Sequence, residues 1–190
     1  MAYGKKIKLW RTPDEDGEFK PLTDKDLERI RSRAKNYCMW AMGNSPKTRK
    51  QLTDKMKQKN CPDEIIEETL KWLEENLLLD DEELAANYVS IKQGMGKGKR
   101  KIAQDLRMKG IDPETIEQVL ENTDEEEERE RALEFVRKRL PSTRRLDPKK
   151  RTSRLVGQLT RNGYNMGMAF SVINEVIAEE GLETEDEDDE

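Results

Sequence analysis

Basic side chains gather in two segments of the chain, and their chemistry is that of a surface for polyanions. Residues 135–164 contain ten arginines and lysines against a single acid, Asp147. Residues 97–101 (KGKRK) add four more bases, and Arg107 and Lys109 follow on the same predicted helix. Clustered cations bind phosphates and release their counterions. An acidic protein groove is the other partner that this charge would attract, and a solvated helix face is the alternative without a partner.

The expected contact surface has two parts, one from each basic segment. Arg100 and Arg107 are seven residues apart, so they share one face of a helix, opposite or beside Ile102 and Leu106. The expected contact residues are Lys97, Lys99, Arg100, Lys101, Arg107, Lys109, Arg144, Arg145, Lys149, Lys150, Arg151, Arg154 and Arg161.

Other reactive residue types do not form a catalytic pattern. The chain has no histidine, the commonest general base, and no paired carboxylates in an apolar setting. The segment GMGKGKRK lacks the GxxxxGK[ST] spacing of a phosphate loop. Cys38 and Cys61 lie on or beside apolar helical positions, which is typical of buried free thiols in a reducing cytoplasm. We therefore expect a cytoplasmic binding protein, not an enzyme, with no cofactor, bound metal or membrane-spanning segment.

The elements that must position the basic residues read as helices from Thr23 onward. The predicted helices are 24–42, 46–59, 63–76, 81–93, 98–109, 113–122, 124–140, 148–162 and 166–180. An N-cap residue directly before a proline marks three starts, at Ser45-Pro46, Asp112-Pro113 and Asp147-Pro148. Thr123 and Glu126 are predicted to form a capping box. Residues 1–22 could form a short strand pair around KIKLW and EFK, or a flexible arm.

A repeat emerges when these helices are placed in register. The apolar pair Leu52/Met56 corresponds to Ile102/Leu106 and to Leu155/Leu159. A residue that tolerates the left-handed conformation follows each pair at the same offset, namely Asn60, Gly110 and Gly163. A second set of apolar pairs comes next, formed by Ile66/Leu70, Ile116/Leu120 and Ala169/Ile173. The alternative is three unrelated helical hairpins, but the agreement favours a tandem repeat.

The fold class that follows is all-α, with three tandem three-helix repeats in an elongated, curved array. Such an array has small local cores, which agrees with 33% hydrophobic and 41% charged residues. The expected domains are an N-terminal arm (1–22), three repeats (23–79, 80–123 and 124–181) and a disordered acidic tail (182–190). That tail could also fold back onto the basic third repeat.

Trp40, Trp72 and Tyr88 are expected to pack in cores, with base stacking as the alternative. Met166 and Met168 are likewise expected to pack.

Residues 74–120 resemble the central signature of the RecX regulatory proteins. The shared features are a leucine run with an acidic turn (Leu77 to Asp81), Ala85 and Tyr88 on a helix, and a Gly-Lys-Gly turn at 96–98. A basic helix with Ile102 and Leu106 then leads to Lys109, Gly110 and Ile111. The resemblance extends more loosely from about residue 33 to 178, and the family fold has three tandem three-helix repeats. Asn60 replaces a usual glycine, and residues 1–30 and the acidic end have no counterpart.

The resemblance implies a function that the composition alone does not give. RecX proteins modulate the bacterial RecA recombinase, so the implied protein is a monomeric regulator in DNA repair, recombination and the SOS response. It would lodge in the groove of the RecA–DNA filament, touch single- and double-stranded DNA through its basic patches, and inhibit recombinase and co-protease activity. Two alternatives stay open, a stand-alone nucleic-acid-binding module and a helical adaptor for an acidic protein.

Overall fold

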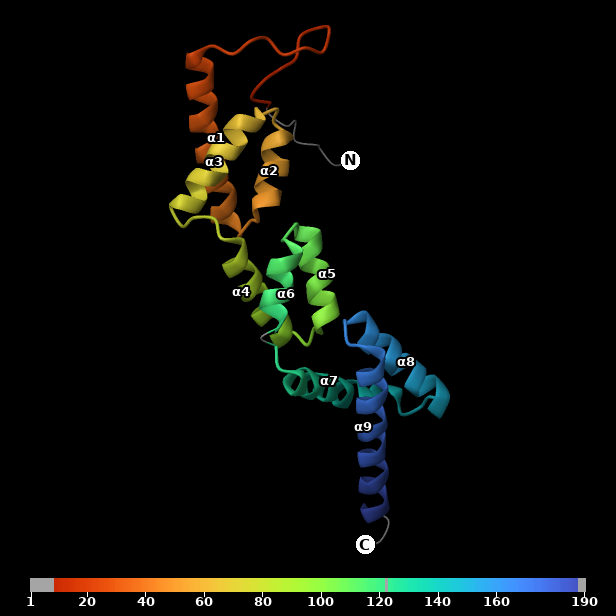
Figure 1. Cartoon of the computed structure of the whole chain (residues 1–190). Coiled ribbons are helices and arrows are strands. Elements are labelled where there is room, and N and C mark those ends of the chain that lie inside the picture. Colours follow the sequence, from red (N-terminus) through yellow and green to blue (C-terminus); the bar gives the residue numbers. More distant parts are fainter. Residues whose placement is uncertain (1–8, 122, 188–190) are drawn as a thin grey trace. The chain divides into compact units, whose positions relative to one another are not determined.

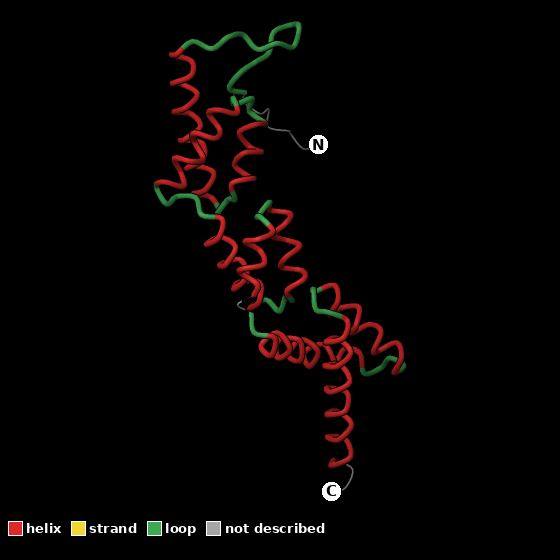
Figure 2. The backbone as a smooth tube through the Cα atoms, viewed as in Figure 1, coloured by secondary structure: helices red, strands yellow, loops and turns green. Residues whose placement is uncertain are grey.

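The described part of the chain is helical throughout, as predicted. The computed structural model describes residues 9–121 and 123–187, and these ranges hold nine α-helices, one 3-10 helix and no strand (Figures 1 and 2). The α-helices are α1 (Asp24–Asn44), α2 (Arg49–Lys57), α3 (Asp63–Glu75), α4 (Asp81–Gly94), α5 (Lys99–Lys109), α6 (Pro113–Glu121), α7 (Glu125–Arg139), α8 (Pro148–Arg161) and α9 (Met166–Glu187). The 3-10 helix η1 (Leu140–Thr143) follows α7. The first two predicted repeats each span three of the α-helices, and the third spans α7, α8 and most of α9.

The turns after the second helix of each repeat confirm the register. Asn60, Gly110 and Gly163 have φ values of 56°, 81° and 96°, so all three adopt the left-handed conformation. The apolar positions on either side of these turns are buried, except Leu120, which is half-buried. The tandem three-helix repeat is therefore a property of the backbone as well as of the sequence.

Two of the predicted helix starts are confirmed. The Asp147 carboxylate accepts the backbone N–H of Lys149 at 3.0 Å, and Pro148 occupies the first helical position of α8. The Asp112 carboxylate accepts the N–H of Glu114 at 2.9 Å, with Pro113 opening α6.

Two other predicted starts are wrong. Helix α2 begins at Arg49 and not at Pro46, because Thr48 forms a capping box with Gln51. Ser45 instead has an extended backbone, as the residue before a proline prefers. Helix α7 is capped by Asp124, which accepts the N–H of Glu126 at 2.9 Å. The hydroxyl of Thr123 accepts a hydrogen bond from Gln93 instead.

The helices form two compact units. The first takes in the chain up to Leu84 and the turn Lys109–Ile111, and the second takes in Ala85–Met108 and the residues from Asp112 onward. In the first unit α1 and α2 pack on α3, and in the second α7, α8 and α9 pack on one another. No helix in the described ranges is both long enough and apolar enough to cross a membrane.

The core of the first unit contains both cysteines. Cys38 and Cys61 are free and buried among leucine and isoleucine side chains, as predicted. The Cys38 sulfur lies 3.7 Å from the sulfur of Met56. Burial raises the pKa of both thiols to about 12. The neutral thiol is therefore the stable form at neutral pH.

The segment before α1 is an ordered arm where it is described. The N–H of Trp10 donates to the carbonyl of Lys59 at 2.8 Å, and the Asn60 amide donates to the carbonyl of Arg11 at 3.0 Å. Residues 9–23 contain no strand, so the predicted strand pair is absent from them. Residues 6–8 of that prediction lie outside the described ranges.

Three further predictions differ from the structure. Trp40 is 67% exposed and Met166 is 59% exposed, so neither is a core residue. Trp40 points outward because Ala34, Cys38 and Ala41 occupy the buried face of α1.

Helix α9 reaches Glu187, beyond the expected end at 180 and into the segment expected to be disordered. No proline interrupts it, and glutamate is a good helix former. Residues 188–190 lie outside the described ranges.

In the first unit, the start of α2 is completed by residues of the next repeat. The buried Thr48 hydroxyl donates to the carbonyl of Lys109 at 2.6 Å, and the N–H of Arg49 donates to the Asp81 carboxylate at 2.9 Å. Burial raises the pKa of Asp81, and this hydrogen bond opposes the rise. Gly110 approaches Lys50 so closely that a Cβ added at Gly110 would lie 2.0 Å from the Cδ of Lys50.

In the second unit, the start of α5 is completed in the same way. The N–H of Gly98 donates to the carbonyl of Asn162 at 2.9 Å, and the N–H of Arg100 donates to the carbonyl of Gly163 at 3.2 Å. The N–H of Lys99 donates to the carboxylate of Glu128 at 2.8 Å.

The two contacts, which we call junctions, are copies of each other. Arg49 and Lys99 are 50 residues apart and each donates its N–H to a carboxylate from the first turn of a following helix. The left-handed turn at Gly110 or Gly163 supplies the other half of each junction. The junction is thus part of the repeat.

Replacing Gly163 by alanine should weaken the second junction. A Cβ there would lie 2.3 Å from the backbone nitrogen of Lys101, and the φ of 96° is unfavourable for alanine. We expect a loss of about 2 kcal/mol or more in the free energy of unfolding, measured by urea denaturation. The control is Gly94→Ala in α4, where an added Cβ meets nothing within 4 Å. Equal stability of the two variants would contradict the close backbone contact.

The buried thiols should be inert in the folded protein. At about pH 8 we expect Cys38 and Cys61 to react with Ellman's reagent only after guanidinium chloride is added, because the thiolate is the reactive form. Prompt release of thionitrobenzoate from the native protein would show that the core of the first unit is open.

Candidate nucleic-acid interface

Helix α5 presents two arginines on its outer face. Arg100 and Arg107 are exposed, while Ile102 and Leu106 on the opposite face are fully buried. Among the described side chains, no carboxylate lies within 4 Å of either guanidinium group. We call these two residues the α5 surface. Their full charge is available to a partner.

The lysines beside this surface have structural partners. The Lys97 ammonium donates to the side-chain carbonyl of Asn162 at 2.6 Å, and the Lys99 ammonium donates to the backbone carbonyl of Thr123 at 2.7 Å. Both acceptors are uncharged, so neither lysine has an anionic partner in these contacts. Lys101 forms an ion pair with Asp105 at 2.9 Å, and Lys109 is half-buried at the first junction. The backbone that the Gly-Lys-Gly turn approaches is that of Gly163.

Helix α8 carries the larger group of exposed bases. Its buried face is formed by Leu155 and Leu159, and Lys150, Arg154 and Arg161 share a face because they are four and eleven residues apart. Among the described side chains, no carboxylate lies within ion-pair distance of these bases. With Lys149 and the preceding loop residue they form what we call the α8 surface: Arg145, Lys149, Lys150, Arg154 and Arg161.

The α8 surface begins on an additional turn of helix. In the repeat register Arg151 corresponds to Thr48 and Gly98, which lie at the starts of α2 and α5. Helix α8 nevertheless begins at Pro148, one turn earlier, and is capped by its own Asp147. That extra turn holds Lys149 and Lys150.

Four arginines of the second unit face glutamates of α9. Glu180 accepts from Arg144 at 2.7 Å and also pairs with Arg151. Burial raises the pKa of Glu180, but the hydrogen bonds from these two arginines outweigh it and hold the pKa below its usual value. Glu179 pairs with Arg137 at 3.0 Å, and Arg129 pairs with Glu175. Sequence reasoning missed these partners because they lie 29 to 46 residues from their arginines.

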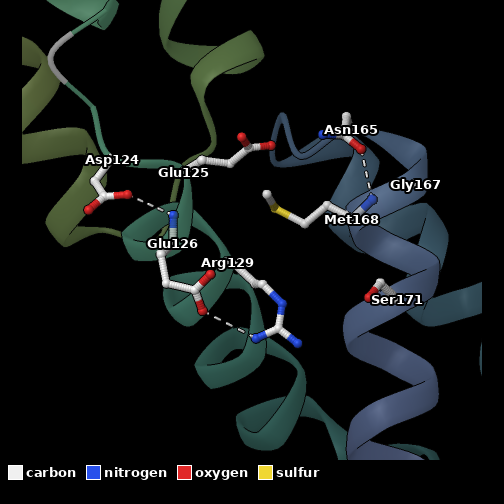
Figure 3. Close-up of a pocket in the computed structure, with 8 residues that line it drawn as sticks. All are labelled: Asp124, Glu125, Glu126, Arg129, Asn165, Gly167, Met168 and Ser171. Atoms are coloured by element: carbon white, nitrogen blue, oxygen red, sulfur yellow. Dashed lines mark hydrogen bonds and ion pairs between the residues drawn. The ribbon is translucent and has the colours of Figure 1, made fainter.

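A pocket in the second unit lies between the starts of α7 and α9 (Figure 3). Glu125, Glu126 and Arg129 line one side, and Met168 and Ser171 line the other. Asn165 accepts the N–H of Met168 at 2.7 Å and so caps α9. The carboxylates at the rim of this pocket repel phosphate. We therefore place the candidate interface on the α5 and α8 surfaces and not at the pocket.

The protein is a tandem array of three-helix domains with exposed cations. Its predicted contact residues include no catalytic group. Profiles of one family match the chain three times, described as the first, second and third three-helix domains of RecX, at residues 34–73, 80–120 and 125–173.

Individual relatives agree with these profiles. The chain is 37% identical over 153 residues to Regulatory protein RecX of Streptomyces lividans, covering 80% of this chain and 81% of the relative. It is 39% identical to Regulatory protein RecX of Mycolicibacterium smegmatis, covering 77% and 81%. The crystal structure of RecX from Lactobacillus salivarius shares the fold with a TM-score of 0.72 at 20% identity, covering 80% of this chain and 99% of that one. The chain belongs to the RecX family of regulatory proteins.

Replacing Glu180 by glutamine should destabilise the second unit and make its free energy of unfolding depend less on pH. The wild-type carboxylate contributes stability above its unfolded pKa of about 4.5, and this contribution is lost as the pH falls through the lower folded pKa. We expect Glu180→Gln to lose about 1–2 kcal/mol near pH 7 and little near pH 3, measured by urea denaturation. Glu134→Gln, which removes an exposed pair with Lys138, is the control and should change stability little. A larger loss in the control would contradict this assignment.

Proposed function

We propose that this protein is a non-enzymatic regulator that binds the groove of the RecA–DNA filament and inhibits recombinase and co-protease activity in DNA repair and the SOS response. Membership of the RecX family supports a regulatory role. The observation that carries the DNA contact is the α8 surface, where five exposed bases lie without carboxylate partners among the described side chains. A phosphate backbone supplies the missing charge.

The predicted contact residues divide into three groups in this proposal. The α5 and α8 surfaces contact the partner directly. Lys97, Lys99, Lys101 and Lys109 are half-buried near the α5 surface and contribute less directly. Arg144 and Arg151 are held by Glu180 and would have to exchange that carboxylate for a phosphate.

Inhibition of the DNA-dependent ATPase of RecA tests the proposal. We expect ATP hydrolysis on single-stranded DNA to fall at substoichiometric amounts of this protein, because one regulator in a filament groove affects many RecA subunits. Unchanged hydrolysis with this protein in excess would refute the RecA role. Steep salt-dependent DNA binding without any effect on RecA would indicate a stand-alone nucleic-acid module, and no DNA binding at all would indicate an adaptor for an acidic protein.

Charge reversal on the extra turn of α8 should weaken DNA binding without unfolding the helix. We expect Lys149→Glu with Lys150→Glu to reduce affinity for a labelled single strand at least about tenfold and to reduce the salt slope by about 1.4, as for the loss of two phosphate contacts. Acids favour the first turn of a helix, so α8 should persist.

The matched control for this double variant changes the same charge elsewhere. Lys25 and Lys71 are exposed lysines of the first unit, and Lys25 also lies in the first turn of its helix. Lys25→Glu with Lys71→Glu should leave affinity and salt slope close to wild type. Equal losses in both double variants would show that net charge matters and not the α8 surface.

A further inference from the structure

Three aromatic rings form a connected group on the first unit. The rings of Trp10 and Tyr37 meet edge to face with centroids 5.6 Å apart, and those of Tyr37 and Trp40 lie 5.9 Å apart at an interplanar angle of 32°. Tyr37 and Trp40 are neighbours on α1, three residues apart, whereas Trp10 comes from the arm. The arm is fixed to the turn after α2 by the Trp10–Lys59 and Asn60–Arg11 hydrogen bonds. The group is therefore built by tertiary structure.

The outermost ring of this group faces solvent. Trp40 is 67% exposed, although indole is among the side chains that gain most from burial. Tyr37 and Trp10 are partly buried against the core of the unit. Tyr37 contacts the ring of Trp40, and Trp10 in turn contacts Tyr37. The rest of the Trp40 indole is available to a ligand.

Cations accompany the rings. The ammonium of Lys59 lies 4.7 Å from the centroid of the Tyr37 ring and 6.0 Å from that of Trp10. Arg33 is exposed on the same face of α1 as Trp40, seven residues before it or about 10 Å along the helix. No carboxylate among the described side chains pairs with Arg33 or Lys59. Asn36 lies between Arg33 and Trp40 on that face and adds a hydrogen-bonding group.

We propose that Trp40, supported by Tyr37 and Trp10 and flanked by Lys59 and Arg33, binds single-stranded nucleic acid by stacking on an unpaired base. A nucleotide offers a flat π face next to a phosphate, which matches an exposed indole next to unpaired cations. In a duplex the base faces are stacked on one another, so the ligand must be single-stranded or have a displaced base. The inference extends the proposed function and rests on different residues in a different unit.

The experiment compares a labelled oligothymidylate with an abasic oligonucleotide of equal length, by fluorescence anisotropy, in the absence of RecA. Both carry the same phosphate charge, and only the first has bases to stack. We expect Trp40→Ala to weaken oligothymidylate binding at least about fivefold and to leave abasic binding and the salt slope unchanged. Trp40→Tyr should restore most of the affinity. Met39→Ala removes a neighbouring exposed apolar side chain and is the control, expected to bind like wild type.

Other results would overturn the inference in identifiable ways. Equal binding of the two oligonucleotides by the wild type, or unchanged oligothymidylate binding by Trp40→Ala, would exclude stacking at this site. If Lys149→Glu with Lys150→Glu still weakened binding in that case, the proposed function would stand without the stacking site. If Trp40→Ala bound DNA normally but inhibited the RecA ATPase poorly, the aromatic surface would contact protein and not a base.

Discussion

The fold depends on how the first N–H groups of α2 and α5 are satisfied. A helix start leaves backbone donors without partners, and side chains or neighbouring segments must supply acceptors. Here the acceptors for Arg49 and Lys99 are Asp81 and Glu128, carboxylates from the first turn of a following helix. A three-helix repeat of about 50 residues has a small core and therefore relies on the next repeat to complete it. The junctions thus tie each of the first two repeats to residues of the repeat that follows.

The same constraint explains where the free charge lies. The starts of α2 and α5 are occupied by junction contacts, so the bases near α5, such as Lys97 and Lys99, are tied to neighbouring carbonyls. The start of α8 is capped by its own Asp147 and gains a turn that carries exposed lysines. The one helix start that departs from the repeat thus lies in the α8 surface, whose five bases have no carboxylate partner among the described side chains. The start of the second helix therefore forms a junction in the first two repeats, and in the third repeat it carries the exposed bases of the candidate interface.

Much of the fold could be predicted from the sequence because its determinants are local. Apolar spacing defined all nine helices, and the stop residues Asn60, Gly110 and Gly163 defined the repeat. The predicted start of α2 was wrong because Ser45 and Thr48 are both acceptable caps. Thr48 forms a capping box with Gln51 and also a hydrogen bond to the carbonyl of Lys109, and the second contact is not visible in the sequence. The outer position of Trp40 depends on which face of α1 meets α3, and helical spacing alone did not determine that.

The candidate site was less predictable because it depends on pairing between distant segments. A charge count treats all ten bases of 135–164 alike, although Arg137, Arg144 and Arg151 are neutralised by glutamates of α9. No sequence pattern marks these pairs. Only the ion pairs of the folded chain show that Arg145 and Arg154 differ from Arg144 and Arg151, which Glu180 holds.

The glutamates of α9 act as permanent counterions. When lysine or arginine side chains neutralise the phosphates of a nucleic acid, cations condensed on the phosphates are released, and this release makes binding depend on the salt concentration. An arginine that turns from Glu180 to a phosphate also gives up an ion pair, so the loss of that pair offsets part of the gain. Contacts made by Arg144 and Arg151 would therefore strengthen binding less than contacts made by the α8 surface. Helix α9 thus divides the basic residues of this unit into a set that is free to bind and a set that must first exchange a partner.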